Sequence, residues 1–100
     1  MTMDWIKQTE EAVELRLSGK LDTISSPAVL LELQKAAEEF KALTLNFEQV
    51  SYISSAGLRT LFTVQKQVSR SGGSMTLTAV APKVMEVLEL TGFSGILNIK

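Results

Sequence analysis

Two segments of the chain alternate apolar and polar residues with a period of two, which is typical of strands that bury one face. The alternation covers residues 12–18 and 43–47, and we predict a strand over each. Their apolar members are Val13, Leu15, Leu17, Leu43, Leu45 and Phe47. Shorter apolar runs predict three further strands, one beginning at Trp5, one over 75–80 and one over 96–99.

A helix is predicted after a loop over residues 19–25, because apolar residues then recur at helical spacing. Ser26 is expected to be its N-cap, with Pro27 in the first helical position, where the missing amide hydrogen matters least. The helix should end near Lys41. Its apolar positions are Val29, Leu33, Ala36 and Phe40, reinforced by Leu30 and Ala37.

Two more helices are predicted by the same spacing. One follows Ser54 and Ser55 and runs to about Arg70, where a Ser-Gly-Gly sequence supplies the left-handed residues that end a helix. Its apolar positions are Leu58, Leu61, Phe62, Val64 and Val68. The other restarts at Pro82 and stops at Gly92.

The order of these elements predicts an α/β fold in a single domain over residues 1–100. A polar connection over 8–11 is expected to form a hairpin between the first two strands. The later strands alternate with helices, so right-handed crossovers should place them parallel in one sheet. We expect a four- or five-stranded mixed β-sheet with helices packed mainly on one side.

Composition excludes several classes of function. Ten basic and eleven acidic residues give a net charge of -1, without the basic block that direct nucleic-acid binding needs. The chain has no cysteine, which fits a cytoplasmic location, and no histidine, the usual general base and metal ligand. No apolar run approaches the roughly 20 residues that span a bilayer, so membrane insertion is not expected.

Catalytic and cofactor-binding motifs are also missing. Gly19-Lys20 is followed by Leu21 and lacks the preceding glycine of a phosphate-binding loop. A serine nucleophile needs a base, and none lies near Ser54 or Ser55 in the sequence. We therefore expect no enzymatic activity, no catalytic residue, no metal site and no cofactor.

The two serines between a strand and a helix are the most informative polar residues. The first turn of a helix has unpaired amide groups and the positive end of the helix dipole. Ser54 or Ser55 could cap these amides, and a phosphate attached there would be stabilised. Chemistry alone leaves open whether the serines form a structural cap or a switch.

Three stretches resemble one known family in the same order along the chain. They are the segments 52–59 (YISSAGLR), 17–22 (LSGKLD) and 90–93 (LTGF). Together they resemble the STAS domain (sulphate transporter and anti-sigma factor antagonist), in its bacterial anti-sigma factor antagonist form. The resemblance identifies Ser55, followed by Ala56-Gly57-Leu58, as the phosphorylated serine. The family often has Asp before that serine, and here Ser54 stands in its place, so modification of Ser54 stays open.

The resemblance also implies a function and a set of partners. The unmodified domain would bind an anti-sigma factor that is also a serine kinase and thereby free a sigma factor for transcription. The kinase would use ATP and Mg²⁺ to phosphorylate Ser55 and end the complex, and a PP2C-type phosphatase would restore binding. The implied partner-binding residues are Asp22, Ser54, Ser55, Ala56, Gly57, Leu58 and Arg59.

Three of these residues have individual interpretations. Asp22 either faces the partner or accepts hydrogen bonds from its own loop. Gly57 is expected to let a partner approach the helix start closely. Arg59 either reaches a phosphate or is an ordinary exposed side chain.

Two other functions remain open. One is a STAS regulatory subunit of a membrane transport complex, for example a lipid-transport ATPase. The other is a small-ligand or nucleotide sensor that uses the helix N-terminus as an anion site.

Overall fold

The structure is a computed structural model that describes residues 1–100 and contains five strands, three α-helices and one short 3₁₀ helix. In chain order these are β1 (Thr2–Gln8), β2 (Ala12–Leu21), α1 (Ser26–Glu39), β3 (Ala42–Ile53), α2 (Ser55–Arg70), β4 (Ser74–Thr78), α3 (Pro82–Leu90), η1 (Phe93–Gly95) and β5 (Asn98–Ile99). None of the helices is both long and apolar enough to cross a membrane.

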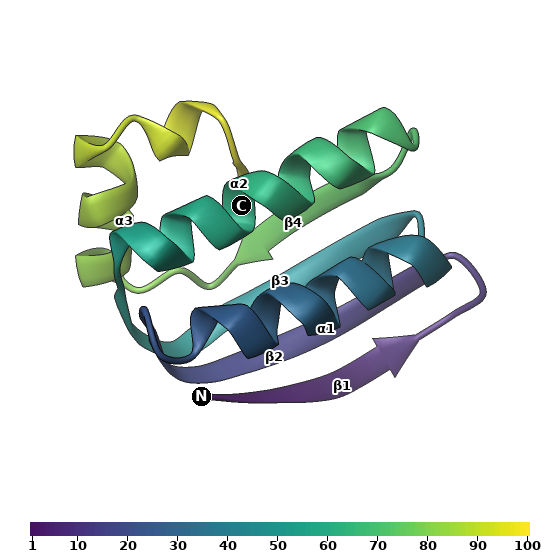
Figure 1. Cartoon of the computed structure of the whole chain (residues 1–100), viewed down its shortest axis with the longest axis horizontal. Helices are drawn as coiled ribbons and strands as arrows, with labels where there is room; N and C mark the ends of the chain where they lie inside the picture. The colour runs from purple at the N-terminus through teal and green to yellow at the C-terminus, as the bar shows by residue number, and fades with distance from the viewer.

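The strands form one mixed sheet in the order β1-β2-β3-β4-β5. β1 and β2 make an antiparallel hairpin, and every later pair is parallel. Helices α1 and α2 lie side by side over one face of this sheet (Figure 1). The predicted α/β class, the five-stranded mixed sheet and the one-sided helix packing are confirmed.

The core lies between that sheet face and the helices. The six alternating apolar residues of β2 and β3 are each at most 2% exposed, as the period of two predicted. They join a single cluster of 23 buried apolar residues with contributions from all three α-helices. The buried cluster fixes the ends of β2, β3 and α2 relative to one another, and those ends carry the candidate site.

Strands β2 and β3 extend further than their alternation indicates. Residues 19–21, predicted as loop, belong to β2, and β3 continues from the predicted end at Phe47 to Ile53. Lys20 pairs with Tyr52 and Leu21 pairs with Ile53, after two irregularities in the register. At each irregularity one strand contributes an extra residue, so buried apolar residues no longer occur at every second position. The alternation therefore ends before the backbone pairing does.

The expected N-cap of α1 is wrong. Ser25 occupies the cap position without a side-chain cap bond, so the buried Ser26 is the first helical residue and Pro27 the second, one position later than predicted. The reason is the preceding turn: the Ser26 amide donates to the Asp22 carbonyl at 2.9 Å, and the Ser25 hydroxyl donates to the Lys20 carbonyl at 2.7 Å. The Ser26 amide is therefore already paired as in a helix, and the Ser25 hydroxyl bonds to the turn instead of to a helix amide.

Candidate functional site

The serine turn joins the end of β3 to the start of α2. Ser54 is the N-cap, with extended backbone, and its side-chain oxygen accepts a hydrogen bond of 3.3 Å from the Gly57 amide. The Ser54 carbonyl accepts a second bond of 2.9 Å from the Leu58 amide, the first intrahelical bond of α2. Ser54 therefore has the structural role of a cap.

Ser55 is the first residue of α2 and is exposed. Its side chain takes no part in the cap, so the hydroxyl is available from solvent. A group attached to this oxygen would stand at the positive end of a 16-residue helix, beside amides that have no partner within the helix. The two serines thus have different surroundings, which their adjacency in the sequence could not reveal.

A second turn, formed by residues 22–25, lies beside the serine turn. One carboxylate oxygen of Asp22, Oδ1, accepts hydrogen bonds of 3.0 Å from the amides of Ile24 and Ser25. The Ser25 backbone bond is the main reason why the pKa of Asp22 lies below its ordinary value. The interpretation that Asp22 accepts hydrogen bonds from its own loop is confirmed, and its contact with a partner stays a prediction.

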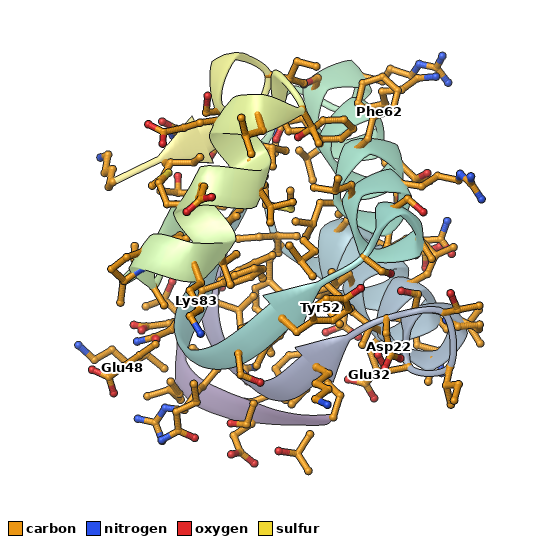
Figure 2. All side chains as sticks on the ribbon, turned by 90° about the vertical axis from the view of Figure 1, so that its left-hand side faces the viewer. Asp22, Glu32, Glu48, Tyr52, Phe62 and Lys83 are labelled. Atoms are coloured by element: carbon orange, nitrogen blue, oxygen red, sulfur yellow. The ribbon has the colours of Figure 1, made fainter.

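The two turns are joined by a direct backbone bond. The Ser54 amide donates to the Leu21 carbonyl at 2.9 Å, at the point where the parallel strands β2 and β3 both end. Figure 2 looks onto this end of the sheet and shows Tyr52 of β3 close to Asp22. The Asp22 turn and the serine turn therefore lie side by side at one edge of the sheet.

Gly57 has a packing role within the fold, and the expected approach of a partner at this residue stays a prediction. It is buried, and a Cβ atom at this position would lie 2.7 Å from the Leu21 carbonyl oxygen and 2.9 Å from Cγ1 of Ile53. The missing side chain lets the first turn of α2 pack directly on the strand ends. Close approach of a partner is not needed to explain this glycine.

The other predicted partner-binding residues differ in exposure. Arg59 is exposed and Ala56 is half-buried, whereas Leu58 is only 6% exposed and faces the core. In the free chain the surface around Ser55 is therefore formed by Ser54, Ala56 and Arg59 rather than by Leu58. Their contact with a partner stays a prediction.

Two apolar side chains beside this surface were missed by the sequence analysis. Ile24, in the Asp22 turn, is 90% exposed, and Tyr52, just before the serine turn, is 50% exposed. A signal for Ile24 was available, since a large apolar residue stands alone in the polar loop that precedes the first helix. Its exposure depends on the turn geometry and could not be read from the pattern.

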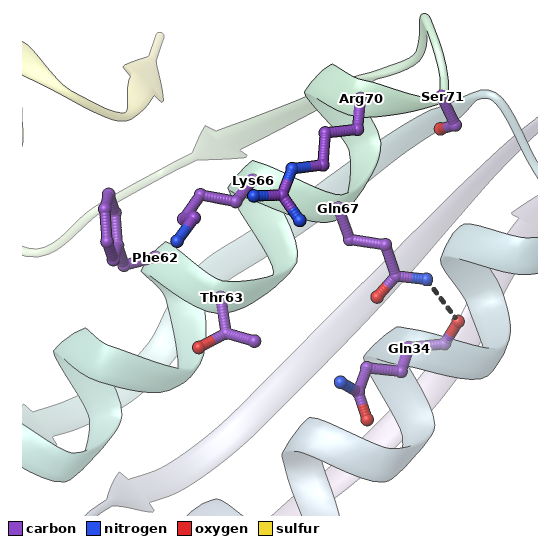
Figure 3. Close-up of a pocket in the computed structure, with 7 residues that line it drawn as sticks. All are labelled: Gln34, Phe62, Thr63, Lys66, Gln67, Arg70 and Ser71. Carbon is purple, nitrogen blue, oxygen red and sulfur yellow. Dashed lines mark hydrogen bonds between the residues drawn. The ribbon is translucent and has the colours of Figure 1, made fainter.

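A surface hollow of about 440 Å³ lies between α1 and α2, away from the serine turn (Figure 3). Phe62, counted above as an apolar helix position, is 37% exposed here, with the Lys66 ammonium 5.3 Å from its ring centre. Arg70 is the second cation of the lining, and no carboxylate or histidine contributes to it. No group of three or more His, Cys, Asp or Glu side chains is positioned to hold a metal ion.

Comparison with known proteins identifies the family. The model of the STAS domain matches residues 5–100, so the chain belongs to the STAS domain family. The anti-sigma-B factor antagonist of Bacillus subtilis is 29% identical over 94 residues, which cover 94% of this chain and 86% of that protein. The anti-sigma F factor antagonist of Paenibacillus polymyxa is 28% identical over 87 residues, covering 85% of this chain and 74% of that protein.

Solved structures share the fold. The Bacillus anti-sigma factor antagonist SpoIIAA in its unphosphorylated form superposes with a TM-score of 0.77 at 20% identity, covering 99% of this chain and 87% of that chain. The phosphorylated form of SpoIIAA superposes with a TM-score of 0.76 at 20% identity, covering 99% of this chain and 91% of that chain. The STAS domain of a SulP transporter from Vibrio cholerae superposes with a TM-score of 0.68 at 18% identity, covering 94% of this chain and 75% of that chain. These likenesses establish the fold alone.

Proposed function

We propose that this chain is an anti-sigma factor antagonist that acts by partner switching. The unmodified domain binds an anti-sigma factor that is also a serine kinase, and this frees a sigma factor. The kinase phosphorylates Ser55 with ATP and Mg²⁺, the complex dissociates, and a PP2C-type phosphatase reverses the modification. In this proposal the chain is a cytoplasmic substrate and ligand of other proteins and not itself an enzyme, and it contacts no nucleic acid.

The observation that carries the proposal is the exposed hydroxyl of Ser55 at the start of α2. Ser54 already caps the helix, so a kinase that modifies Ser55 does not have to break the cap bond. The names of the relatives described above support the same function. Ser55 is therefore the preferred acceptor, and Ser54 is the second candidate.

Phosphorylation would act on the surface and leave the interior unchanged. A phosphate adds about -1.5 to -2 charge near neutral pH, and the amides and positive dipole end of α2 stabilise negative charge at this position. Arg59 stands four residues further on, on the same side of the helix, and can reach a phosphate on Ser55. A docked partner would meet the added bulk and charge, so binding would be lost while the fold is kept.

The experiment is phosphorylation by the cognate anti-sigma serine kinase with ATP and Mg²⁺, followed by mass spectrometry and a binding measurement. We expect one phosphate on Ser55, loss of the complex, and recovery after treatment with the phosphatase. Ser54→Ala should still accept the phosphate, whereas Ser55→Ala should not. A phosphate that maps to another residue, or a Ser55→Asp variant that binds the kinase as tightly as the unmodified chain, would contradict the mechanism.

Two other functions predict different results. A regulatory subunit of a transport complex, such as a lipid-transport ATPase, would be recovered with an ATPase or permease and without a kinase. The fold shared with a transporter STAS domain makes this the second candidate. A nucleotide sensor would show calorimetric binding of nucleotides that substitution of Ser55 or Asp22 weakens.

A further inference from the structure

A second surface hollow lies between α1 and α2, at the end where both helices begin (Figure 1). It has a volume of about 350 Å³, which is in the size range of small-molecule sites. Its walls come from the first turns of α1, around Ser26, and from the first turns of α2, around Arg59. Neither Asp22 nor Ser55 belongs to the lining, so the hollow is separate from the phosphorylation candidate.

One buried hydroxyl group of this lining has no partner. Ser26 is only 5% exposed, and its Oγ atom makes no hydrogen bond within the chain. Buried polar side-chain atoms nearly always have a partner in the protein or in bound solvent, so an unpaired one needs an explanation such as a bound water or ion. Thr60 of α2 is also 5% exposed and lines the same hollow. Two hydroxyl side chains, one from each helix, therefore belong to this wall.

The charge of the hollow favours an anion. Arg59 is the charged residue of the lining, and no carboxylate accompanies it. Helix α2 carries Arg59, Lys66 and Arg70 and has no acidic residue, although the whole chain has a net charge of -1. Both helices begin at the hollow, so the positive ends of their dipoles add to the charge of Arg59. A guanidinium beside hydroxyl groups and helix N-termini is an arrangement that suits phosphate oxygens.

The rest of the lining indicates an organic group on the anion. Pro27 and Leu30 of α1 and Ala56 of α2 give the hollow an apolar wall. Inorganic phosphate would leave this wall in contact with water, whereas an ester with an apolar group would cover it. The lining has no aromatic side chain on which a nucleobase could stack. These features favour a small phosphate monoester over inorganic phosphate or a nucleotide.

We propose that the hollow between the first turns of α1 and α2 binds a small phosphate monoester through Arg59, Ser26 and Thr60. Arg59 supplies charge-assisted hydrogen bonds to the phosphate, and Ser26 gains the partner that it lacks in the free chain. The Thr63 hydroxyl already donates to the Arg59 carbonyl at 2.9 Å and is not one of the donors. The chain binds this ligand by itself, without the kinase or the phosphatase of partner switching.

An NMR titration of the isotopically labelled chain with phenyl phosphate, at constant pH and ionic strength, tests the site. We expect saturable shifts of the Ser26, Arg59 and Thr60 amides, weaker binding of inorganic phosphate and no binding of phenol. The absence of saturable shifts with phenyl phosphate would overturn the proposal. Inorganic phosphate that binds as tightly as phenyl phosphate, or phenol that binds at the same amides, would overturn the assignment of a phosphate monoester.

Matched variants separate the hollow from the general charge of α2. Arg59→Gln and Ser26→Ala should each weaken the binding of phenyl phosphate about 10-fold, since each removes a hydrogen bond to a charged group. Arg70→Gln removes the same charge from the same helix, but Arg70 lines the other hollow. Its affinity should stay within about 2-fold of the original chain, because solvent and salt screen the more distant charge. Equal losses in Arg59→Gln and Arg70→Gln would contradict the site.

The Ser26 variant also separates ligand binding from folding. The Ser26 hydroxyl has no partner to lose, so the free Ser26→Ala chain should unfold at the same temperature as the original chain or at a higher one. Weaker binding at unchanged or higher stability would support a role of this hydroxyl in holding the ligand. A variant that unfolds at a lower temperature and still binds phenyl phosphate as tightly as the original chain would contradict that role.

Discussion

The amide of Ser54 donates a 2.9 Å hydrogen bond to the carbonyl of Leu21, and this bond joins the two turns at the carboxyl ends of β2 and β3. Parallel neighbouring strands end at the same edge of a sheet, so segments 32 residues apart in sequence become one surface. The serine turn and the Asp22 turn should therefore respond together to a substitution in either one.

Replacing Gly57 by alanine should destabilise the fold. The added Cβ would meet the Leu21 carbonyl oxygen at 2.7 Å, and the strand end or the first turn of α2 must shift. We expect a loss of about 1–3 kcal/mol in the free energy of unfolding, measured by urea denaturation. Gly95→Ala is the control, since a Cβ there meets no atom within 4 Å. A loss of the same size in both variants would show that the contact with Leu21 is not responsible.

Alanine substitutions of Ser54 and Ser55 should differ in their effect on the free energy of unfolding. Ser54→Ala removes the bond to the Gly57 amide and should reduce the free energy of unfolding by about 1 kcal/mol. Ser55→Ala removes an exposed hydroxyl outside the cap and should change it by less than about 0.5 kcal/mol. Thermal denaturation of the two variants side by side provides the measurement. The assignment of Ser54 as the cap would be wrong if the Ser55 variant were the less stable one.

The sign of the charge at position 55 should matter for stability. Ser55→Asp places a negative charge at the positive end of α2 and four residues before Arg59, whereas Ser55→Lys places a positive charge there. We expect the Asp variant to be more stable than the Lys variant by about 1 kcal/mol at low ionic strength. The difference should shrink in high salt, because both side chains are exposed. A difference that salt does not change would point to a local steric cause.

Acid should weaken the Asp22 turn. The pKa of Asp22 is lowered in the folded chain, chiefly by the Ser25 amide, so the folded state favours the ionised carboxylate. This contribution is fully present above the ordinary aspartate pKa of about 3.9 and is lost as pH falls through the lower folded value. As the pH falls below the ordinary aspartate pKa of about 3.9, the original chain should therefore lose more stability than Asp22→Asn. Urea denaturation across this range, with an NMR titration of the Asp22 carboxyl carbon, measures both quantities. Parallel stability curves for the two chains would contradict the shift.

Much of the fold followed from local patterns in the chain. The alternation in β2 and β3 marked residues that are buried, and the helical spacing identified α1, α2 and α3 close to their observed limits. Gly72 and Gly92 have positive φ, as predicted for helix ends. These features depend on a few neighbouring residues, so the sequence was sufficient to predict them.

The candidate site was predicted less completely. The position of the serines at a helix start followed from the change of period between strand and helix, and the function implied for Ser55 came from family resemblance. Which serine caps the helix and which is exposed depends on the backbone angles in the turn. A sequence of two adjacent serines does not specify those angles. The N-cap expected at Ser26 was wrong because the Asp22 turn provides other partners for the backbone there.

By itself the sequence determined which faces are apolar, which segments form the three α-helices, and that the chain has no cysteine or histidine for chemistry. Only the tertiary structure decided that β2 and β3 extend to Leu21 and Ile53, that Gly57 packs against the Leu21 carbonyl, and that Ile24 stands in solvent beside the serine turn. The physical reason is that these properties arise from pairing and packing between segments distant along the chain, whereas hydrophobic periodicity reports only on neighbours.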